Sequence, residues 1–286
     1  MKTFRSLALT LGAVLMVALA APAAAQWSPS YEAIKGMDES FRLDLGGFFQ
    51  SFDTTVQRYK SDGTPGTEFN LGEIGGDENE TTFRMDGMWR FGRHGNLQFG
   101  YRGWSNSNSV VLGRDIQWGD NVYHVGAQVD HKLKQNVASL YYGYSFVNDG
   151  ELEFGLMLGL SAYFNSLSLS ASASVGGSGG GGTTASSIDE KNFVAPIPAL
   201  GGYFNFTLLP RFFVWARAYG LPKVTISGYS ASMVDATGGL DYFFTRNFGI
   251  GAGYEYTKLT FEHPVENGIR IVQSYSGFLG YLSIAF

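Results

Sequence analysis

GFLGYLSIAF, the stretch at residues 277–286, alternates between two sets of side chains up to its last residue. A period of two is typical of an extended strand whose two faces meet different surroundings. Chain ends are usually poorly ordered, so a strand that continues to the final residue predicts a terminus held in a sheet. The more apolar set of this strand consists of Phe278, Gly280, Leu282, Ile284 and Phe286.

The beginning of the chain has the three parts of a secretory signal peptide. Lys2 and Arg5 supply positive charge, residues 7–20 form an apolar run, and the small residues 23–25 make a cleavage site. The apolar run is too short for a transmembrane helix and has the flanks of a signal sequence. We therefore expect residues 1–25 to be removed during export.

The composition of the remaining chain excludes several classes of protein. Export removes two of the 20 Lys and Arg and none of the 25 Asp and Glu, so the mature chain is acidic and lacks the basic footprint of a nucleic-acid-binding protein. There is no cysteine, which excludes disulfide scaffolds and thiolate sites. No mature segment has the about 18 consecutive apolar residues of a membrane helix. An exported chain of this kind can cross a membrane only as a closed barrel.

Alternating segments recur along the mature chain after a short periplasmic lead-in at residues 26–39. They predict an all-β fold over residues 40–286, a transmembrane antiparallel up-and-down barrel of about ten strands, with eight or twelve if one hairpin is misread. Pro196 and Pro198 weaken the start of the sixth segment. The predicted strands are about 41–58, 80–91, 96–118, 122–147, 151–170, 193–208, 211–227, 230–244, 247–261 and 269–286.

The connections are predicted to differ between the two ends of the barrel. Loops are expected at residues 59–79, 174–191 and 262–268, and tight connections at 119–121 and near Gly228. Short turns on one side and longer loops on the other are typical of outer-membrane barrels, with the turns in the periplasm. The four short turns are predicted at residues 92–95, 148–150, 209–211 and 245–247.

The charged residues of the strands avoid the apolar phase, where an Arg or Lys at mid-bilayer would cost about 2–4 kcal/mol. A ten-stranded barrel has a narrow interior, and buried charges in it must be paired. Two interpretations follow, a salt-bridged plug that closes the barrel and a narrow polar conduit for a small solute. The charges assigned to the interior are Arg42, Asp44, Arg84, Asp86, Arg90, Arg102, Glu153, Asp235, Asp241 and Glu255.

The terminal strand that ends on Phe286 resembles the C-terminal signature of bacterial outer-membrane β-barrels, which the barrel assembly machinery reads through residues such as Phe278, Leu282, Ile284 and Phe286. Over about residues 41–286 the chain resembles the OmpA/OmpW-like class of small barrels. The resemblance implies a location in the bacterial outer membrane. It also implies membrane lipid and lipopolysaccharide as partners, and a monomer. It rests on alternation, loop asymmetry and the terminal Phe.

Candidate chemistry lies at the extracellular side of the predicted barrel. Asp130 and His131, with Asp115 and Asp120 nearby, resemble the acidic residues and Asp–His pair of outer-membrane proteases in residue type and height. Adjacent strand residues point to opposite faces, however, which argues against one catalytic unit. The glycine-rich run at 176–182 lacks the ending of a phosphate loop and reads as a flexible loop. An acidic cluster in the first loop lacks EF-hand spacing and consists of Glu73, Asp77, Glu78 and Glu80.

These observations predict a non-enzymatic outer-membrane protein without cofactor or metal. Its expected role is structural, or the passage of a small solute through a narrow charged lumen. The alternatives are a surface-acting enzyme on lipid A or peptide, and an adhesin or receptor that uses the long loops. One fold hosts many functions, so the fold alone does not choose among them.

Overall fold

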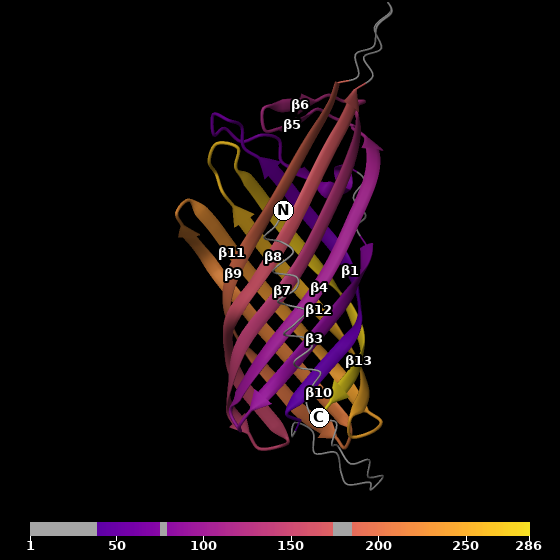
Figure 1. Cartoon of the computed structure of the whole chain (residues 1–286), viewed down its shortest axis with the longest axis vertical. Helices are drawn as coiled ribbons and strands as arrows, with labels where there is room; N and C mark the ends of the chain where they lie inside the picture. The colour runs from indigo at the N-terminus through magenta and orange to yellow at the C-terminus, as the bar shows by residue number, and fades with distance from the viewer. Residues whose placement is uncertain (1–38, 75–78, 174–184) are drawn as a thin grey trace, which may run out of the picture. The chain divides into compact units, whose positions relative to one another are not determined.

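The computed structural model describes residues 39–74, 79–173 and 185–286, and in them ten long antiparallel strands form a closed barrel (Figure 1). The predicted signal peptide and all but the last residue of the predicted lead-in lie outside these ranges. The barrel strands are β1 (Phe41–Arg58), β3 (Asn79–Phe91), β4 (Gly95–Val111), β7 (Gln128–Asn148), β8 (Leu152–Ala173), β9 (Ala185–Leu209), β10 (Phe212–Ile226), β11 (Tyr229–Phe243), β12 (Phe248–Glu262) and β13 (Ile269–Ala285).

The barrel closes between its first and last strands. β1 and β13 pair antiparallel without interruption from Arg42↔Ala285 to Arg58↔Ile269, and β13 pairs on its other side with β12. The predicted terminal strand is therefore confirmed, and it has a partner on both sides. The predicted all-β class and the number of ten strands are also confirmed.

The two ends of the barrel differ as predicted. Four short connections follow β3, β7, β9 and β11, and Gly92 and Gly150 adopt positive φ in two of them. Glycine takes this conformation without the steric cost that other residues incur. Most connections at the opposite end are longer, and one contains β2 (Phe69–Asn70) and the short 3-10 helix η1 (Leu71–Ile74), whereas β10 and β11 are joined there by Ser227 and Gly228 alone.

Two predicted boundaries are wrong, both at the end with the longer connections. The third and fourth strands were expected to meet at residues 119–121, but β4 ends at Val111 and β7 begins at Gln128. Between them β5 (Ile116–Trp118) and β6 (Asn121–Tyr123) form a separate hairpin, in which Ile116, Trp118 and Tyr123 are buried. The predicted loop at 174–191 is shorter than expected because residues 185–191 belong to β9, whereas the glycine-rich run 176–182 lies outside the described residues.

The outward phase of the strands forms an apolar belt, as predicted. Leu158, Leu200 and Phe278 are each at least 60% exposed, as expected of side chains that face lipid. Alternate residues on the same strands are buried inside the barrel, among them Met157 and Leu279. In the described part of the chain, no helix has the length and apolar character needed to cross a membrane.

Candidate functional site in the barrel interior

All ten charged residues assigned to the interior lie on the inward face of their strands, and they form three clusters. The central cluster contains Arg84, Asp86, Arg102 and Glu255, with Asp235 beside them. The other two lie nearer the short turns. These two clusters are Arg42–Asp44–Asp241 and Arg90–Glu153.

Glu255 on β12 is the centre of the first cluster. Its carboxylate accepts hydrogen bonds from the guanidinium groups of Arg84 on β3 and Arg102 on β4. Its side chain is only 1% exposed, so the two ion pairs are shielded from water. β12 lies three strands from β3 and four from β4, which means that these bonds cross the interior of the barrel.

The register of the strands explains why these ion pairs cross the interior of the barrel. Arg84 and Arg102 lie directly opposite each other on β3 and β4, and Asp44 lies opposite Asp86 on β1 and β3. Like charges in directly opposed positions destabilise a sheet. Asp86 pairs with Arg84 on its own strand, and Glu255 supplies the remaining negative charge from across the barrel.

Asp235 differs from the other interior carboxylates because it forms no ion pair with any described residue. Its two oxygens accept hydrogen bonds from Thr257 at 2.6 Å and from Thr237 at 3.2 Å. Both threonines also donate to Glu255, at 3.3 and 3.2 Å, so the two carboxylates share hydroxyl donors. The hydroxyl groups thus satisfy a carboxylate that no arginine reaches.

The second cluster holds β1 against β11. Arg42 pairs with Asp44 at 2.9 Å and with Asp241 at 2.8 Å. The hydroxyl of Tyr281 donates to Asp241 at 2.6 Å and accepts from the indole nitrogen of Trp215 at 2.8 Å. Trp215 on β10 and Tyr281 on β13 lie three strands apart, so this chain of bonds also spans the interior.

The third cluster is a bidentate ion pair across the interior. Arg90 on β3 donates to Glu153 on β8 through both terminal nitrogens, at 2.6 and 2.9 Å. Ser145 and Asn205 donate to the same carboxylate at 2.6 and 2.8 Å. Planar fork-to-carboxylate pairing of this kind is among the stronger hydrogen-bonded contacts in proteins.

Several interior residues were missed by the sequence prediction. Gln135 on β7 donates to Gln273 on β13 at 3.0 Å, and Asn96 on β4 donates to Tyr203 on β9 at 2.8 Å. Because these residues are uncharged, their place in the inward phase of the alternation was the sole feature of the sequence that indicated an interior position. Arg217 lies on β10, the strand whose phase was least clear, with its guanidinium carbon 5.2 Å from the centroid of the Trp215 ring.

Gly251 makes room for the aromatic network of the second cluster. A Cβ at this position would collide with the ring of Tyr281 and with a carboxylate oxygen of Asp241. Tyr281 cannot turn away without losing its bonds to Trp215 and Asp241. Glycine is therefore needed at position 251 to leave space for the ring of Tyr281 inside the barrel, and not to form a turn.

We expect Gly251→Val to destabilise the folded barrel by about 1–3 kcal/mol, the usual cost of overpacking a filled interior. Urea unfolding in detergent micelles would measure the change. The double variant Gly251→Val/Tyr281→Ala tests the cause, because removal of the ring should make the valine less harmful. Equal costs of Gly251→Val with and without the Tyr281 ring would contradict this explanation.

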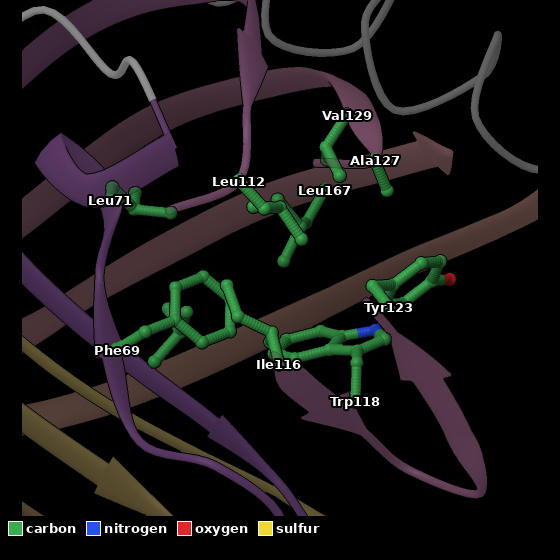
Figure 2. Close-up of a cluster of buried hydrophobic side chains, with 10 residues drawn as sticks. Phe69, Leu71, Leu112, Ile116, Trp118, Tyr123, Ala127, Val129 and Leu167 are labelled. Carbon is green, nitrogen blue, oxygen red and sulfur yellow. The ribbon is translucent and has the colours of Figure 1, made fainter. Parts of the chain in front are cut away.

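An apolar cluster, here called the cap cluster, fills the barrel beneath the longer connections (Figure 2). Trp118 from the β5–β6 hairpin stacks edge-on against Phe69 with ring centroids 5.7 Å apart. Backbone and side-chain bonds between Gln117 and Thr67 join the hairpin to the first loop. The cap cluster consists of Val56, Phe69, Leu71, Leu112, Ile116, Trp118, Tyr123, Ala127, Val129 and Leu167.

Asp115 and Asp120, two of the residues considered for protease-like chemistry, have separate partners. Asp130 and His131 are successive residues of β7, opposite Ser109 and Asn108 on β4. Asp120 accepts hydrogen bonds from the backbone and hydroxyl of Ser61. Asp115 accepts a hydrogen bond from the backbone N–H of Val125 at 2.7 Å, and a carboxylate oxygen of Asp115 lies 3.3 Å from Nδ1 of His124. These two contacts lower the pKa of Asp115 below its usual value. Asp115 and His124 are both largely exposed, which is unlike a shielded catalytic pair.

Two acidic residues of the first loop, Glu73 and Glu80, have different partners. Glu73 forms an ion pair with Arg114 at 2.8 Å, which ties the first loop to the segment before β5. Glu80 accepts a hydrogen bond from Asn106 at 2.8 Å, whereas Asp77 and Glu78 lie outside the described residues. In the described part of the chain, no group of three or more acidic or histidine side chains is arranged to hold a metal ion.

Comparison with known proteins shows similarity in structure but not in sequence. No protein-family model matches the chain, and no curated protein matches it. Outer membrane protease OmpT from Escherichia coli is 14% identical with a TM-score of 0.55, over 87% of this chain and 97% of that chain. OprG from Pseudomonas aeruginosa gives 11% identity and a TM-score of 0.37, over 87% and 97%. The translocator domain of NalP from Neisseria meningitidis gives 11% and 0.38, over 85% and 88%.

At these sequence identities the similarity to OmpT is one of fold. It agrees with the closed antiparallel sheet, the apolar belt and the short turns at one end. A closed barrel is one of the two structures that satisfy their backbone hydrogen bonds in lipid. The chain is therefore a closed antiparallel β-barrel with the fold seen in OmpT.

Proposed function

We propose that this protein is a non-enzymatic structural barrel whose interior is closed along most of its length. The observation that carries the proposal is the series of contacts that cross the interior. Arg90–Glu153 and Trp215–Tyr281 lie toward the short turns, Arg102–Glu255 lies centrally, and the cap cluster lies at the opposite end. Contacts that cross the interior at these heights support the plug interpretation over the conduit.

A narrow path for a small cation is the second candidate. The three clusters contain Arg42, Arg84, Arg90 and Arg102, but six carboxylates including Asp235. An excess of negative charge favours cations over anions in a polar pore. The path would have to open through the contacts described above, which is why we place this function second.

Conductance in planar lipid bilayers distinguishes the two candidates. We expect no steady ionic current from the purified protein, because side-chain contacts cross the interior at several heights. The double variant Arg102→Ser/Glu255→Ser removes the central crossing contact and should permit a measurable current. Steady current through the unmodified protein, with preference for cations, would support the conduit and overturn the plug.

The proposed role implies partners that follow from the surface of the barrel. The exposed apolar belt suits membrane lipid, and the exposed longer connections suit contact with lipopolysaccharide. We propose that the protein acts as a monomer and that the barrel assembly machinery recognises the strand that ends at Phe286. The exposure of the Asp115–His124 pair supports a protein without enzymatic activity.

A further inference from the structure

Asp235 and Glu255 form a closed arrangement with two threonines. In the pairing of β11 with β12, each carboxyl group lies directly opposite a threonine, Thr257 for Asp235 and Thr237 for Glu255. The hydroxyl of Thr257 lies 2.6 Å from Asp235 and 3.3 Å from Glu255. The hydroxyl of Thr237 lies 3.2 Å from an oxygen of each carboxyl group. Each hydroxyl therefore stands between one oxygen of Asp235 and one oxygen of Glu255.

This arrangement is short of hydrogens when both carboxyl groups are ionised. A hydroxyl has one hydrogen to donate, and an ionised carboxylate has none. The two threonines then supply two hydrogens for four oxygen–oxygen contacts, and all four side chains are buried. A proton on Asp235 adds a third hydrogen, because a protonated carboxyl group donates to the hydroxyl of Thr257 while that hydroxyl donates to Glu255.

The charges of the central cluster also leave one negative charge unbalanced. Arg84 and Arg102 supply two positive charges, whereas the carboxyl groups supply three negative charges if Asp86, Glu255 and Asp235 are all ionised. Burial of an unpaired charge is costly, and such a group usually becomes neutral instead. One bound proton makes the cluster neutral.

The surroundings of the two carboxyl groups place this proton on Asp235. Glu255 receives a guanidinium group on each of its oxygens, from Arg84 and Arg102. Among the described residues, Asp235 receives hydrogen bonds from threonine hydroxyls alone. Positive neighbours favour the ionised form of a carboxyl group, and two carboxyl groups that share one site do not both ionise readily.

Arg217 does not balance the charge of Asp235, although it lies diagonally opposite on β10. It stands between Trp215 and Tyr219 on that strand, and Tyr219 is the residue directly opposite Asp235. The guanidinium of Arg217 lies over the ring of Trp215, the farther of these two neighbours from Asp235, and forms no ion pair with a described residue. A neutral Asp235 accounts for this orientation, because an ionised carboxylate would attract the guanidinium.

Three tyrosines also face Asp235. Tyr219 comes from β10, Tyr141 from β7 and Tyr163 from β8, and all three lie within electrostatic range of the carboxyl group. Phenol groups are uncharged at neutral pH, so the tyrosines add neither positive nor negative charge. The charge count of the central cluster therefore stands.

A proton is the cation that this position accommodates. Asp235, Glu255 and Thr257 are each at most 1% exposed, so their side chains are in contact with other protein atoms on nearly all sides. A metal ion between the two carboxyl groups would force these side chains apart, whereas a proton needs no additional space.

We propose that Asp235 is protonated at neutral pH, and that Asp235 and Glu255 together form a proton-binding site in the interior of the barrel. The interior carboxylates that form ion pairs remain ionised. Release of the proton adds a negative charge beside Glu255 that no arginine balances, so alkaline solution weakens the central cluster. The site does not depend on whether the barrel conducts ions.

Infrared spectroscopy of the folded protein at neutral pH tests for the proton. A protonated carboxyl group has a C=O stretching band that is separate from the bands of ionised carboxylates. Subtraction of the spectrum of Asp235→Asn from that of the unmodified protein should leave this band. Labelling of aspartate carboxyl groups with a heavy carbon isotope should shift the band, whereas labelling of glutamate should not.

Asp241→Asn is the matched control, because Asp241 lies on the same strand, is equally buried and forms an ion pair with Arg42. Its difference spectrum should lack the band of a protonated carboxyl group. If Asp241→Asn does not fold, Asp86→Asn, which removes an ion-pair partner of Arg84, takes its place. A difference spectrum of Asp235→Asn without the band would overturn the proposal, as would a band that shifts on labelling of glutamate.

Stability provides the second arm. An asparagine amide is close in shape and charge to a protonated aspartate, so Asp235→Asn should keep the urea midpoint of the unmodified protein at neutral pH, whereas Asp241→Asn should lower it. A group that holds its proton more tightly in the folded than in the unfolded chain contributes stability that is lost as the pH rises. In alkaline solution the midpoint of the unmodified protein should therefore fall below that of Asp235→Asn. Equal losses from the two substitutions at neutral pH would contradict the proposal, and so would coinciding midpoints in alkaline solution.

Discussion

Glu255→Gln is expected to destabilise the folded barrel by about 3–5 kcal/mol, the usual result of removing one member of a buried ion pair. The substitution keeps the size of the side chain but leaves Arg84 and Arg102 opposite each other without their shared counter-charge. Urea unfolding followed by tryptophan fluorescence would measure the loss. Glu266→Gln, which neutralises an exposed carboxylate between β12 and β13, is the control and should change stability little.

Replacement of the whole cluster separates the loss of the ion pairs from the cost of leaving the remaining charges buried without a partner. Apolar residues in place of a complete buried ion-pair group are often neutral for stability, because the desolvation of the charges is also removed. The variant Arg84→Met/Asp86→Leu/Arg102→Met/Glu255→Leu should therefore be more stable than Glu255→Gln. If the single substitution is as mild as Glu266→Gln, the central cluster does not stabilise the barrel as described.

Trp118→Ala is expected to release the β5–β6 hairpin from the barrel end. Truncation of a buried Trp typically costs about 3–5 kcal/mol, and Trp118 is 1% exposed within the cap cluster. Because the hairpin is joined to the rest of the barrel through this cluster, the Gln117–Thr67 bonds and the Glu73–Arg114 ion pair, the cost should appear as local opening. Trypsin cleavage after Arg114 should become faster, while the barrel strands remain protected.

Trp89→Ala supplies a matched control for the hairpin experiment. Trp89 lies on the lipid-facing side of β3 and is 52% exposed, so its truncation leaves the cap cluster intact. The rate of cleavage after Arg114 should not change in this variant. Equal acceleration by the two substitutions would mean that general destabilisation, rather than the cap, controls access to the hairpin.

The sequence was sufficient to predict the strands and their faces because these depend on local alternation. A residue such as Leu158 or Glu153 is assigned to lipid or interior by its phase alone, and the cost of a charge in lipid makes that assignment strict. The ten interior charges were therefore found from the sequence. β1 was predicted with its observed bounds for the same reason.

The partners of those charges could not be predicted, since they depend on which strands face each other across the closed barrel. Arg102 and Glu255 are separated by 153 positions and by four strands, and no local pattern connects them. The β5–β6 hairpin was missed for a related reason. Its residues continue the alternation of β4, although the strand and its pairing with β7 end at Val111.

The register that places Arg84 beside Arg102 has a consequence for the order in which the barrel is assembled. These two arginines come together as soon as the β3–β4 hairpin forms, but their shared counter-ion is on β12, close to the C-terminal end of the chain. An unfinished sheet without β12 therefore carries a pair of like charges that repel each other. Closure removes this repulsion, so the penultimate strand makes incomplete barrels less stable and gives the fold an all-or-none character.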